Sequence, residues 1–433
     1  MNRPRTARLM GLALVAAACA TESPGVDPPE RQLYFPSGMA VSPDGRWLYV
    51  ANANSDLRYN TGTLLALDLA RVGPTCEPDP TNAFADYCPE EGAGFVADGV
   101  RVGTFAADVR VSKDGGRLYV AVRSAPRSIT WIDLDPARNE PLDCGQERFD
   151  ENTCGGEHVV DLIEPEPGGL AAGLPAEPFG LYVHEALGLT PRLLVAHLSR
   201  AGVTVLDDCG GELRALDVSP ALFPADGRGQ SGGFAVAKRP PEDAEEGLFY
   251  VTSRTSSLVG SVLVDPPGVR CDATARVVPG PSFALTGLAD GSDARGIAFF
   301  GADRAFIADR EPPTLVEVDT TLEDGRPRNR SVRTVEVCPE PSVVRVDPAS
   351  PSPVLFVVCF ATSQIFVVDG DLMQIVDVIA TGRGPSALEF HPTEPRAFVT
   401  NFAENTVGII DLAPESPTYR RMIRRLGKPE PLR

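Results

Sequence analysis

Histidine is scarce in this chain of 433 residues, and its scarcity removes several kinds of active site. The four histidines fall in different parts of the chain, at His158, His184, His197 and His391, with no HExxH spacing between any of them. Paired CxxC, Walker and CxxCH sequences are also missing, which excludes the common zinc, nucleotide and haem sites. We therefore expect no metal and no cofactor, and surface or structural roles for His158 and His391.

Positive charge is also in short supply. The chain has 40 Lys and Arg against 59 Asp and Glu, a formal net charge of -19. A nucleic-acid-binding protein needs a cationic face, so we expect no nucleic-acid partner. The 41 glycines and 41 prolines divide the apolar residues into short runs and leave no convincing helix longer than a couple of turns. This pattern is typical of an all-β protein.

Long apolar runs are missing too, apart from one near the start. Three arginines precede Leu9 to Ala18, a run too short to span a bilayer, which takes about 20 residues. Small residues then lead to Cys19. The segment resembles a bacterial lipoprotein signal, in which this cysteine becomes the lipidated N-terminus. The alternative is an ordinary secretory signal cleaved near Ala20.

These features predict a simple organisation. Residues 1–19 would be the signal, residues 20–30 a polar, proline-rich tether, and residues 31–433 a single folded domain. We expect an exported protein held by its lipid in the bacterial outer membrane or periplasm. The membrane would be contacted only through that anchor.

Cysteine usage favours export independently. An oxidising compartment would leave one of nine cysteines unpaired, but removing Cys19 leaves eight. The alternative is eight buried free thiols in a reducing compartment.

One phrase of sequence recurs along the chain, and its last copy, Gly384 to Leu412, is the clearest. It holds three short apolar runs bounded by turn residues, Ala387 to Phe390, Arg396 to Asn401 and Thr406 to Leu412, and these are typical of antiparallel strands. Seven copies result, with first strands that start at Pro36, Ala107, Pro178, Gly232, Ala294, Pro341 and Pro385. A repeat of this size predicts one closed array.

The sequences VSPDGRWLYVAN at Val41 to Asn52 and AFVTN at Ala397 to Asn401 resemble the YVTN family of repeats, within the lactonase-like superfamily. The resemblance spans most of Gln32 to Arg425 and implies a seven-bladed β-propeller of four-stranded antiparallel blades.

Long insertions are expected before three fourth strands, over residues 71–100, 136–159 and 208–215. Two closures of the ring stay open. Either Tyr419 to Leu426 is the outer strand of the last blade, or the segment before Pro36 completes that blade.

Aligning the repeats pairs the eight cysteines. Two bridges lie within loops, Cys76 with Cys88 and Cys144 with Cys154, and a third, Cys209 with Cys271, joins adjacent blades. The fourth, Cys338 with Cys359, is expected on the top face.

The resemblance implies a ligand site on the top face, where the loop into each first strand meets the end of each second strand. The candidate ligand-binding residues there are Arg123, His197, Arg254, Arg295 and Arg310. Such a cationic rim suits a carboxylate or phosphate. Alternatively, the arginines pair with neighbouring acids such as Asp108, Asp293 and Glu340, or are solvated. His197 is the one histidine predicted on the top rim, where it could act as a general base near Asp309.

Two functions remain. The first is an envelope-anchored scaffold that binds a protein, a glycan or a small anion. The second is a lactonase-like or other hydrolase with its site at the channel mouth. The rim also contains Ala53, Val122 and Leu198, and this mixture favours the scaffold, without enzymatic activity and with no catalytic residue.

Overall fold

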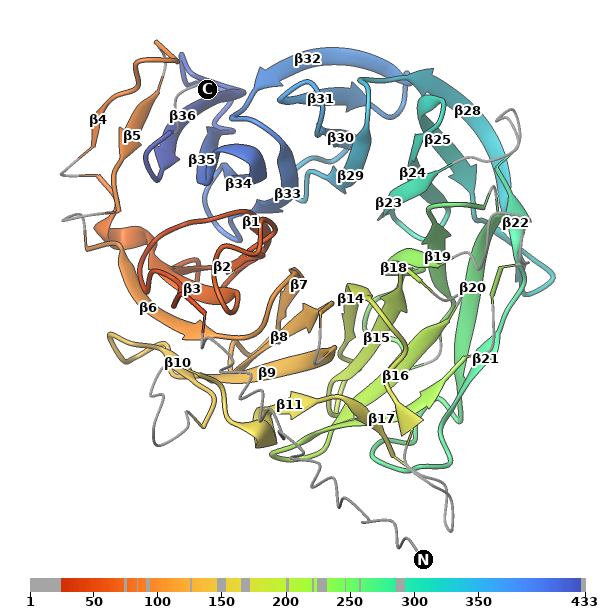
Figure 1. Ribbon diagram of the computed structural model, residues 1–433. Coiled ribbons are helices and arrows are strands. Elements are labelled where there is room, and N and C mark those ends of the chain that lie inside the picture. The colour runs from red at the N-terminus through yellow and green to blue at the C-terminus, as the bar shows by residue number, and fades with distance from the viewer. Residues whose placement is uncertain are drawn as a thin grey trace, which may run out of the picture.

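The computed structural model describes residues 25–73, 76–83, 85–90, 94–124, 127–145, 153–164, 172–199, 202–219, 222–223, 232–245, 247–256, 258–285 and 293–429. The predicted signal and Cys19 lie outside them. The described residues form seven antiparallel blades around one axis, which is a seven-bladed β-propeller (Figure 1). Their helical turns are η1 (Leu69–Arg71), η2 (Gly156–His158) and η3 (Phe402–Glu404). No helix in these ranges is long and apolar enough to cross a membrane.

The first four blades follow the chain in order. Blade 1 contains β1 (Pro36–Val41), β2 (Trp47–Asn52), β3 (Thr63–Asp68) and β6 (Val96–Arg101). Blade 2 contains β7 (Ala106–Val111), β8 (Arg117–Val122), β9 (Ser128–Leu134), β10 (Leu142–Asp143) and β11 (Val159–Val160). Blade 3 contains β14 (Pro178–His184), β15 (Arg192–His197), β16 (Val203–Asp208) and β17 (Leu213–Val218), extended by β12 (Leu162–Ile163) and β13 (Ala172–Gly173). Blade 4 contains β18 (Gly233–Lys238), β19 (Phe249–Ser253), β20 (Leu258–Asp265), β21 (Arg276–Pro279) and β22 (Phe283–Ala284).

The last three blades are the most regular. Blade 5 contains β23 (Ala294–Phe300), β24 (Arg304–Arg310), β25 (Pro313–Asp319) and β28 (Arg330–Glu336), with the hairpin β26 (Leu322–Glu323) and β27 (Arg326–Pro327) beside it. Blade 6 contains β29 (Pro341–Val346), β30 (Val354–Cys359), β31 (Gln364–Asp369) and β32 (Gln374–Ala380). Blade 7 contains β33 (Pro385–Phe390), β34 (Arg396–Asn401), β35 (Thr406–Asp411) and β36 (Arg421–Leu426). All seven predicted copies are therefore confirmed as blades.

The first strand of every blade lies innermost, next to the axis (Figure 1). Each is bulged against its second strand, as in β1, where the register shifts between Pro36 and Met39. A bulge bends its strand locally. The neighbouring first strands also approach closely, since a Cβ on Gly38 would lie 2.7 Å from the carbonyl oxygen of Ala107. We call the face where the first strands begin the top face.

The core lies between blades, where apolar faces of adjacent sheets meet. Leu48 and Leu65 of blade 1 share a cluster with Phe398 and Ile409 of blade 7, so the ring closes through the same packing that joins its other blades. Burying one such side chain is worth about 1.5 to 3 kcal/mol.

Closure of the ring follows the first of the two predicted routes. β36 is the outer strand of blade 7, so one continuous segment builds that blade. Residues 25–35, the described part of the segment before Pro36, add no strand but contact blade 7, where the Phe35 N–H donates to Asn405 Oδ1 at 2.7 Å.

The insertion of blade 1 also contacts blade 7, where the ring closes. Its strand β5 (Asp86–Cys88) pairs in parallel with β36, and β4 (Glu77–Pro78) pairs with β5. We call the described residues of 76–88 the clasp, because they tie blade 1 to the outer edge of blade 7.

The insertion predicted over residues 208–215 is wrong. Asp208 ends β16 and Leu213 begins β17, so only four residues connect these strands. Gly210 and Gly211 both adopt positive φ there, which allows a tight turn. Blade 2 does carry its predicted insertion. Two short strands, β10 and β11, take the position of a single fourth strand in this blade, because both pair with β9.

All four predicted disulfides are confirmed. The Cα–Cα distances are 4.2 Å for Cys76–Cys88, 4.9 Å for Cys144–Cys154, 5.6 Å for Cys209–Cys271 and 5.8 Å for Cys338–Cys359. Four disulfides indicate an exported protein, and they contradict the alternative of eight buried free thiols.

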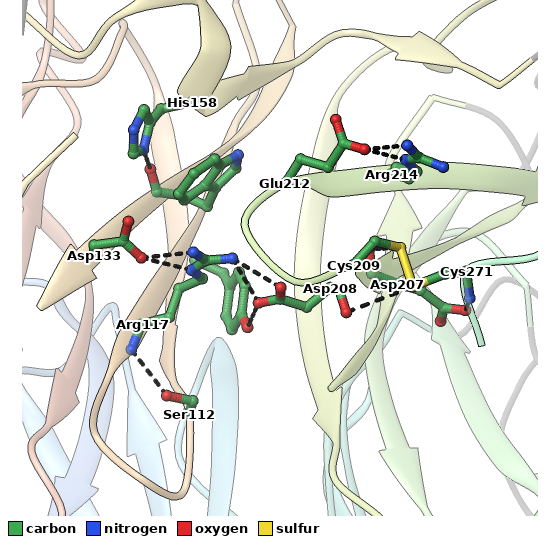
Figure 2. A network of polar contacts seen from close by, with 12 residues as sticks. Ser112, Arg117, Asp133, His158, Asp207, Asp208, Cys209, Glu212, Arg214 and Cys271 are labelled. Carbon is green, nitrogen blue, oxygen red and sulfur yellow. Dashed lines mark hydrogen bonds and ion pairs between the residues drawn. A yellow bond between two sulfur atoms is a disulfide. The ribbon is translucent and has the colours of Figure 1, made fainter. Parts of the chain in front are cut away.

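A polar network surrounds the interblade bridge Cys209–Cys271 (Figure 2). Arg117 of blade 2 contacts Asp208 of blade 3 at 2.8 Å, and Tyr119 donates to the same carboxylate at 2.9 Å. The disulfide, this ion pair and this hydrogen bond therefore join three consecutive blades.

Candidate functional site

A cavity of about 330 Å³ lies in the axial channel. Every one of the seven first strands contributes to its lining. The position of each lining residue along its strand separates this cavity into an aromatic part and a charged part.

The aromatic part consists of five half-buried phenylalanines, which we call the phenylalanine collar. Two stand at the second position of β14 and β18, one precedes β7, and two directly follow β30 and β34: Phe179, Phe234, Phe105, Phe360 and Phe402. The rings of Phe179 and Phe234 are 4.7 Å apart between centroids, and those of Phe360 and Phe402 are 6.1 Å apart. Five different blades therefore present aromatic faces around one opening.

The charged part, which we call the ionic cluster, contains Asp108, Arg110, Arg345 and Glu389. Arg110, Arg345 and Glu389 share the fifth position of their first strands, about 10 Å further along the strand than the second position. Glu389 Oε1 accepts from Arg110 Nη1 at 3.0 Å and from Arg345 Nη2 at 3.1 Å. Arg110 also donates to Asp108 Oδ2 at 3.1 Å and to the carbonyl oxygen of Leu181 at 3.1 Å. The cluster thus connects blades 2, 3, 6 and 7 across the channel.

Arg110 and Arg345 differ in how many of their guanidinium nitrogens already donate hydrogen bonds within the protein. Burial alone would lower the pKa of Arg110, but the Asp108 and Glu389 carboxylates outweigh it and raise that pKa above its usual value. Arg110 uses all three of its guanidinium nitrogens as donors within the protein. Among the described residues, Arg345 donates only through its two terminal nitrogens, and its side chain is 27% exposed. Arg345 can therefore present further N–H groups to an anion in the cavity.

Three of the four arginines predicted on the rim form ion pairs within the propeller. Arg295 forms an ion pair with Asp293 and Arg310 forms one with Glu340 at 3.2 Å, as the alternative interpretation predicted. Arg123 pairs with Glu177 at 2.7 Å and not with Asp108, which the ionic cluster uses. These partners come from the loops that lead into the first strands.

Of the five candidates, Arg123 alone belongs to the described lining of the cavity. Its guanidinium lies over Phe105 and Phe179 of the collar, at 5.8 and 5.7 Å from the ring centroids. Arg254 is exposed and forms no ion pair within the described residues. Partial desolvation of its guanidinium and the neighbouring Arg295 lower the pKa of Arg254. A role for these arginines in ligand binding remains a prediction.

His197 does not face the channel. Its side chain is fully buried within blade 3, where Nε2 lies 2.7 Å from Thr204 Oγ1, and burial lowers its pKa to about 4. The last residue of a second strand thus points into the blade packing. His197 therefore cannot act as a base at the mouth in this arrangement.

The other three histidines also bind backbone carbonyl groups. His158 Nδ1 lies 3.0 Å from the carbonyl oxygen of Trp131, His184 Nε2 lies 2.8 Å from that of Ala244, and His391 Nε2 lies 3.0 Å from that of Gly45. The structural roles predicted for His158 and His391 are confirmed.

The buried His197 predicts a pH-dependent stability. The unfolded chain binds a proton at this histidine near pH 6.5, whereas the folded chain does so only near pH 4. The free energy of unfolding should therefore fall as the pH drops between these values. His197→Gln should reduce the loss between pH 7.5 and 4.5 by about 2 kcal/mol. Urea denaturation at both pH values measures this, and an unchanged pH dependence in the variant would contradict it.

Sequence reasoning missed both parts of the cavity. The signal for the ionic cluster was present, because the fifth position of the aligned first strands is charged in three copies and alanine in three others. No group of three or more potential metal-ligating side chains occurs in the described part of the chain.

No known protein-family model matches this chain, and no curated protein does either. Solved structures do match. A periplasmic gluconolactonase from Pseudomonas aeruginosa is 16% identical, with a TM-score of 0.56, over 86% of this chain and 95% of that one. A putative 6-phosphogluconolactonase from Bacteroides fragilis is 14% identical, with a TM-score of 0.54, over 84% and 94%.

Hydrazine synthase from Kuenenia stuttgartiensis is 14% identical, with a TM-score of 0.55, over 90% of this chain and 97% of that one. These likenesses establish the fold. Seven-bladed propellers of the lactonase-like type are among the structural neighbours, and at such low identity their chemistry does not transfer.

Proposed function

We propose that this propeller is an exported binding protein that holds a small carboxylic acid in its axial cavity. The observation that carries the proposal is Arg345, a half-buried guanidinium with unused donors inside a cavity that five phenylalanines also line. A guanidinium recognises a carboxylate through paired N–H donors in a fixed geometry.

Local charge supports this assignment. The described lining contains three arginines, Arg110, Arg123 and Arg345, and two carboxylates, Asp108 and Glu389, while Glu177 beside the lining pairs with Arg123, so three positive and three negative charges balance. The whole chain carries -19. The cavity thus lacks the excess negative charge of the whole protein, which reduces the electrostatic repulsion of a small anion there.

Anchoring and family also belong to this proposal. The basic and apolar start of the chain supports a lipid on Cys19 and a place in the bacterial outer membrane or periplasm. The tight turn from Ser42 to Gly45 supports a repeat of the YVTN type. Palmitate labelling that persists in Cys19→Ser would exclude the anchor.

Calorimetry with the mature, oxidised protein tests the binding function. The probes are gluconate, galacturonate, benzoate and 3-phenylpropionate, and the test variant is Arg345→Gln. We expect at least one acid to bind, and the variant to bind it at least tenfold more weakly, a loss of about 1.4 kcal/mol or more.

Arg396→Gln is the matched control, because Arg396 is half exposed on β34, forms its ion pair within the described residues with Glu394 and lies outside the cavity lining. It should leave the affinity unchanged. The proposal fails if no acid binds, or if binding survives in Arg345→Gln.

A lactone hydrolase is the second candidate. It is favoured by Glu389, a carboxylate that meets two guanidinium groups at one wall of the cavity, where it could activate water beside cations that stabilise a developing oxyanion. Two structural neighbours named as gluconolactonases support this candidate. Acid release from glucono-δ-lactone should then exceed the spontaneous rate and fall in Glu389→Gln. A wild-type rate equal to the spontaneous one excludes it for this lactone.

A further inference from the structure

We propose that the acid carries a flat apolar body and a single negative charge, as an aryl-substituted monocarboxylate does, and that polyhydroxylated sugar acids and phosphate esters are poor ligands. This inference rests on the proposed binding function and specifies its ligand. Three features of the cavity lead to it.

The first feature is the wall. The phenylalanine collar places five aromatic rings from five blades around the opening, and Arg123 adds its planar guanidinium over two of them. Aromatic rings favour stacked or edge-on contact with another flat apolar group. A ligand that passes the collar therefore gains most from a flat apolar body.

The second feature is the use of the serine hydroxyls. Three serines line the cavity at the second position of their first strands, and each hydroxyl is engaged within the propeller. Ser37 Oγ donates to the carbonyl oxygen of Ala106 at 2.6 Å, and Ser342 Oγ donates to that of Val358 at 3.4 Å.

Ser386 Oγ lies 2.9 Å from Thr400 Oγ1 and 3.3 Å from the carbonyl oxygen of Pro36. The hydroxyl groups of Ser37 and Ser386 thus join neighbouring blades. Within the described lining, Ser55 is the one serine whose hydroxyl forms no hydrogen bond. A sugar acid would bury several hydroxyl groups here with too few partners, and unpaired polar groups weaken binding.

The third feature is the pair of carboxylates, Asp108 and Glu389, in the ionic cluster. Arg345 has further N–H groups for a ligand, but Glu389 Oε1 lies 3.1 Å from its Nη2. A second carboxylate, that of Asp108, accepts a hydrogen bond from Arg110. A carboxylate brings one negative charge to this site. A phosphate monoester brings nearly two, and the Glu389 carboxylate repels the second.

Calorimetry with three probes separates these ligand classes. The probes are 3-phenylpropionate, gluconate and phenyl phosphate, each titrated into the mature, oxidised protein. We expect 3-phenylpropionate to bind at least tenfold more tightly than either of the others. Phe179→Ala should weaken 3-phenylpropionate at least tenfold, whereas Phe179→Leu, which keeps much of the volume, should weaken it less.

Outcomes for the inference and for the proposed function differ. If gluconate or phenyl phosphate binds as tightly as 3-phenylpropionate, and Arg345→Gln abolishes that binding, the inference is overturned and the binding function stands. If no probe binds, both fall. Circular dichroism of Phe179→Ala verifies its fold, and Phe179→Leu provides the test of the collar if the alanine variant is unfolded. Equal affinities of Phe179→Leu and wild type for every probe would also overturn the inference.

Discussion

Arg425→Ala is expected to lower the free energy of unfolding by about 3 to 5 kcal/mol, because it leaves the buried Asp79 carboxylate without its cation and removes the nearer of the two cations beside Glu404. Arg425 is 4% exposed and lies 2.9 Å from Asp79 Oδ2 and 3.1 Å from Glu404 Oε1, both almost fully buried. Asp79 belongs to the clasp and Glu404 to η3 of blade 7. The substitution therefore loosens the closure of the ring.

The matched control for this prediction is Arg421→Ala on the same strand, β36. Arg421 is about half exposed and lies 3.7 Å from Asp377, a pair worth about 0 to 1 kcal/mol. Chemical denaturation of both variants measures the two losses. Equal losses would show that the Arg425 contacts do not stabilise the closure.

Asp207→Ala is expected to cost a similar amount, about 3 to 5 kcal/mol, at the junction of blades 3 and 4. Its carboxylate accepts from Arg192 at 2.6 and 2.8 Å, and both side chains are at most 1% exposed. Asp207 also accepts from the Cys271 N–H at 2.8 Å, beside the disulfide seen in Figure 2. The variant leaves the Arg192 charge buried without its counterion.

Glu394→Ala is the control for that substitution, because Glu394 pairs with Arg396 at 3.2 Å with both side chains half exposed. We expect a loss of at most about 1 kcal/mol. A loss as small as this for Asp207→Ala, measured in the same denaturation series, would contradict the assigned role of the buried pair.

The sequence predicted the blades because each strand leaves a short-range signal. The second strand Trp47 to Asn52 and its six aligned counterparts are short apolar runs, rich in β-branched and aromatic residues and bounded by turn residues. The structure confirms them as strands. The cysteine pairs could also be predicted, because aligned repeats place Cys209 and Cys271 at matching positions of adjacent blades.

The cavity could not be predicted with the same certainty because side-chain direction decides it. The bulge in each first strand breaks the simple alternation of faces, and the alignment alone did not show that Arg110, Arg345 and Glu389 converge across the axis. His197 was placed on the rim by its position in the alignment, yet its side chain points into blade 3.

The clasp was missed for a different reason. β5 is three residues long, and it pairs in parallel with a strand more than 300 positions away, Arg421–Leu426. Local periodicity carries no information about such a partner.

A crystal structure of the mature, oxidised protein grown with 3-phenylpropionate would locate the bound acid. We expect the ligand in the axial cavity, with its ring among the phenylalanines of the collar and its carboxylate about 2.7 to 2.9 Å from a nitrogen of Arg345. Ligand density elsewhere on the propeller, together with an empty cavity, would contradict this prediction.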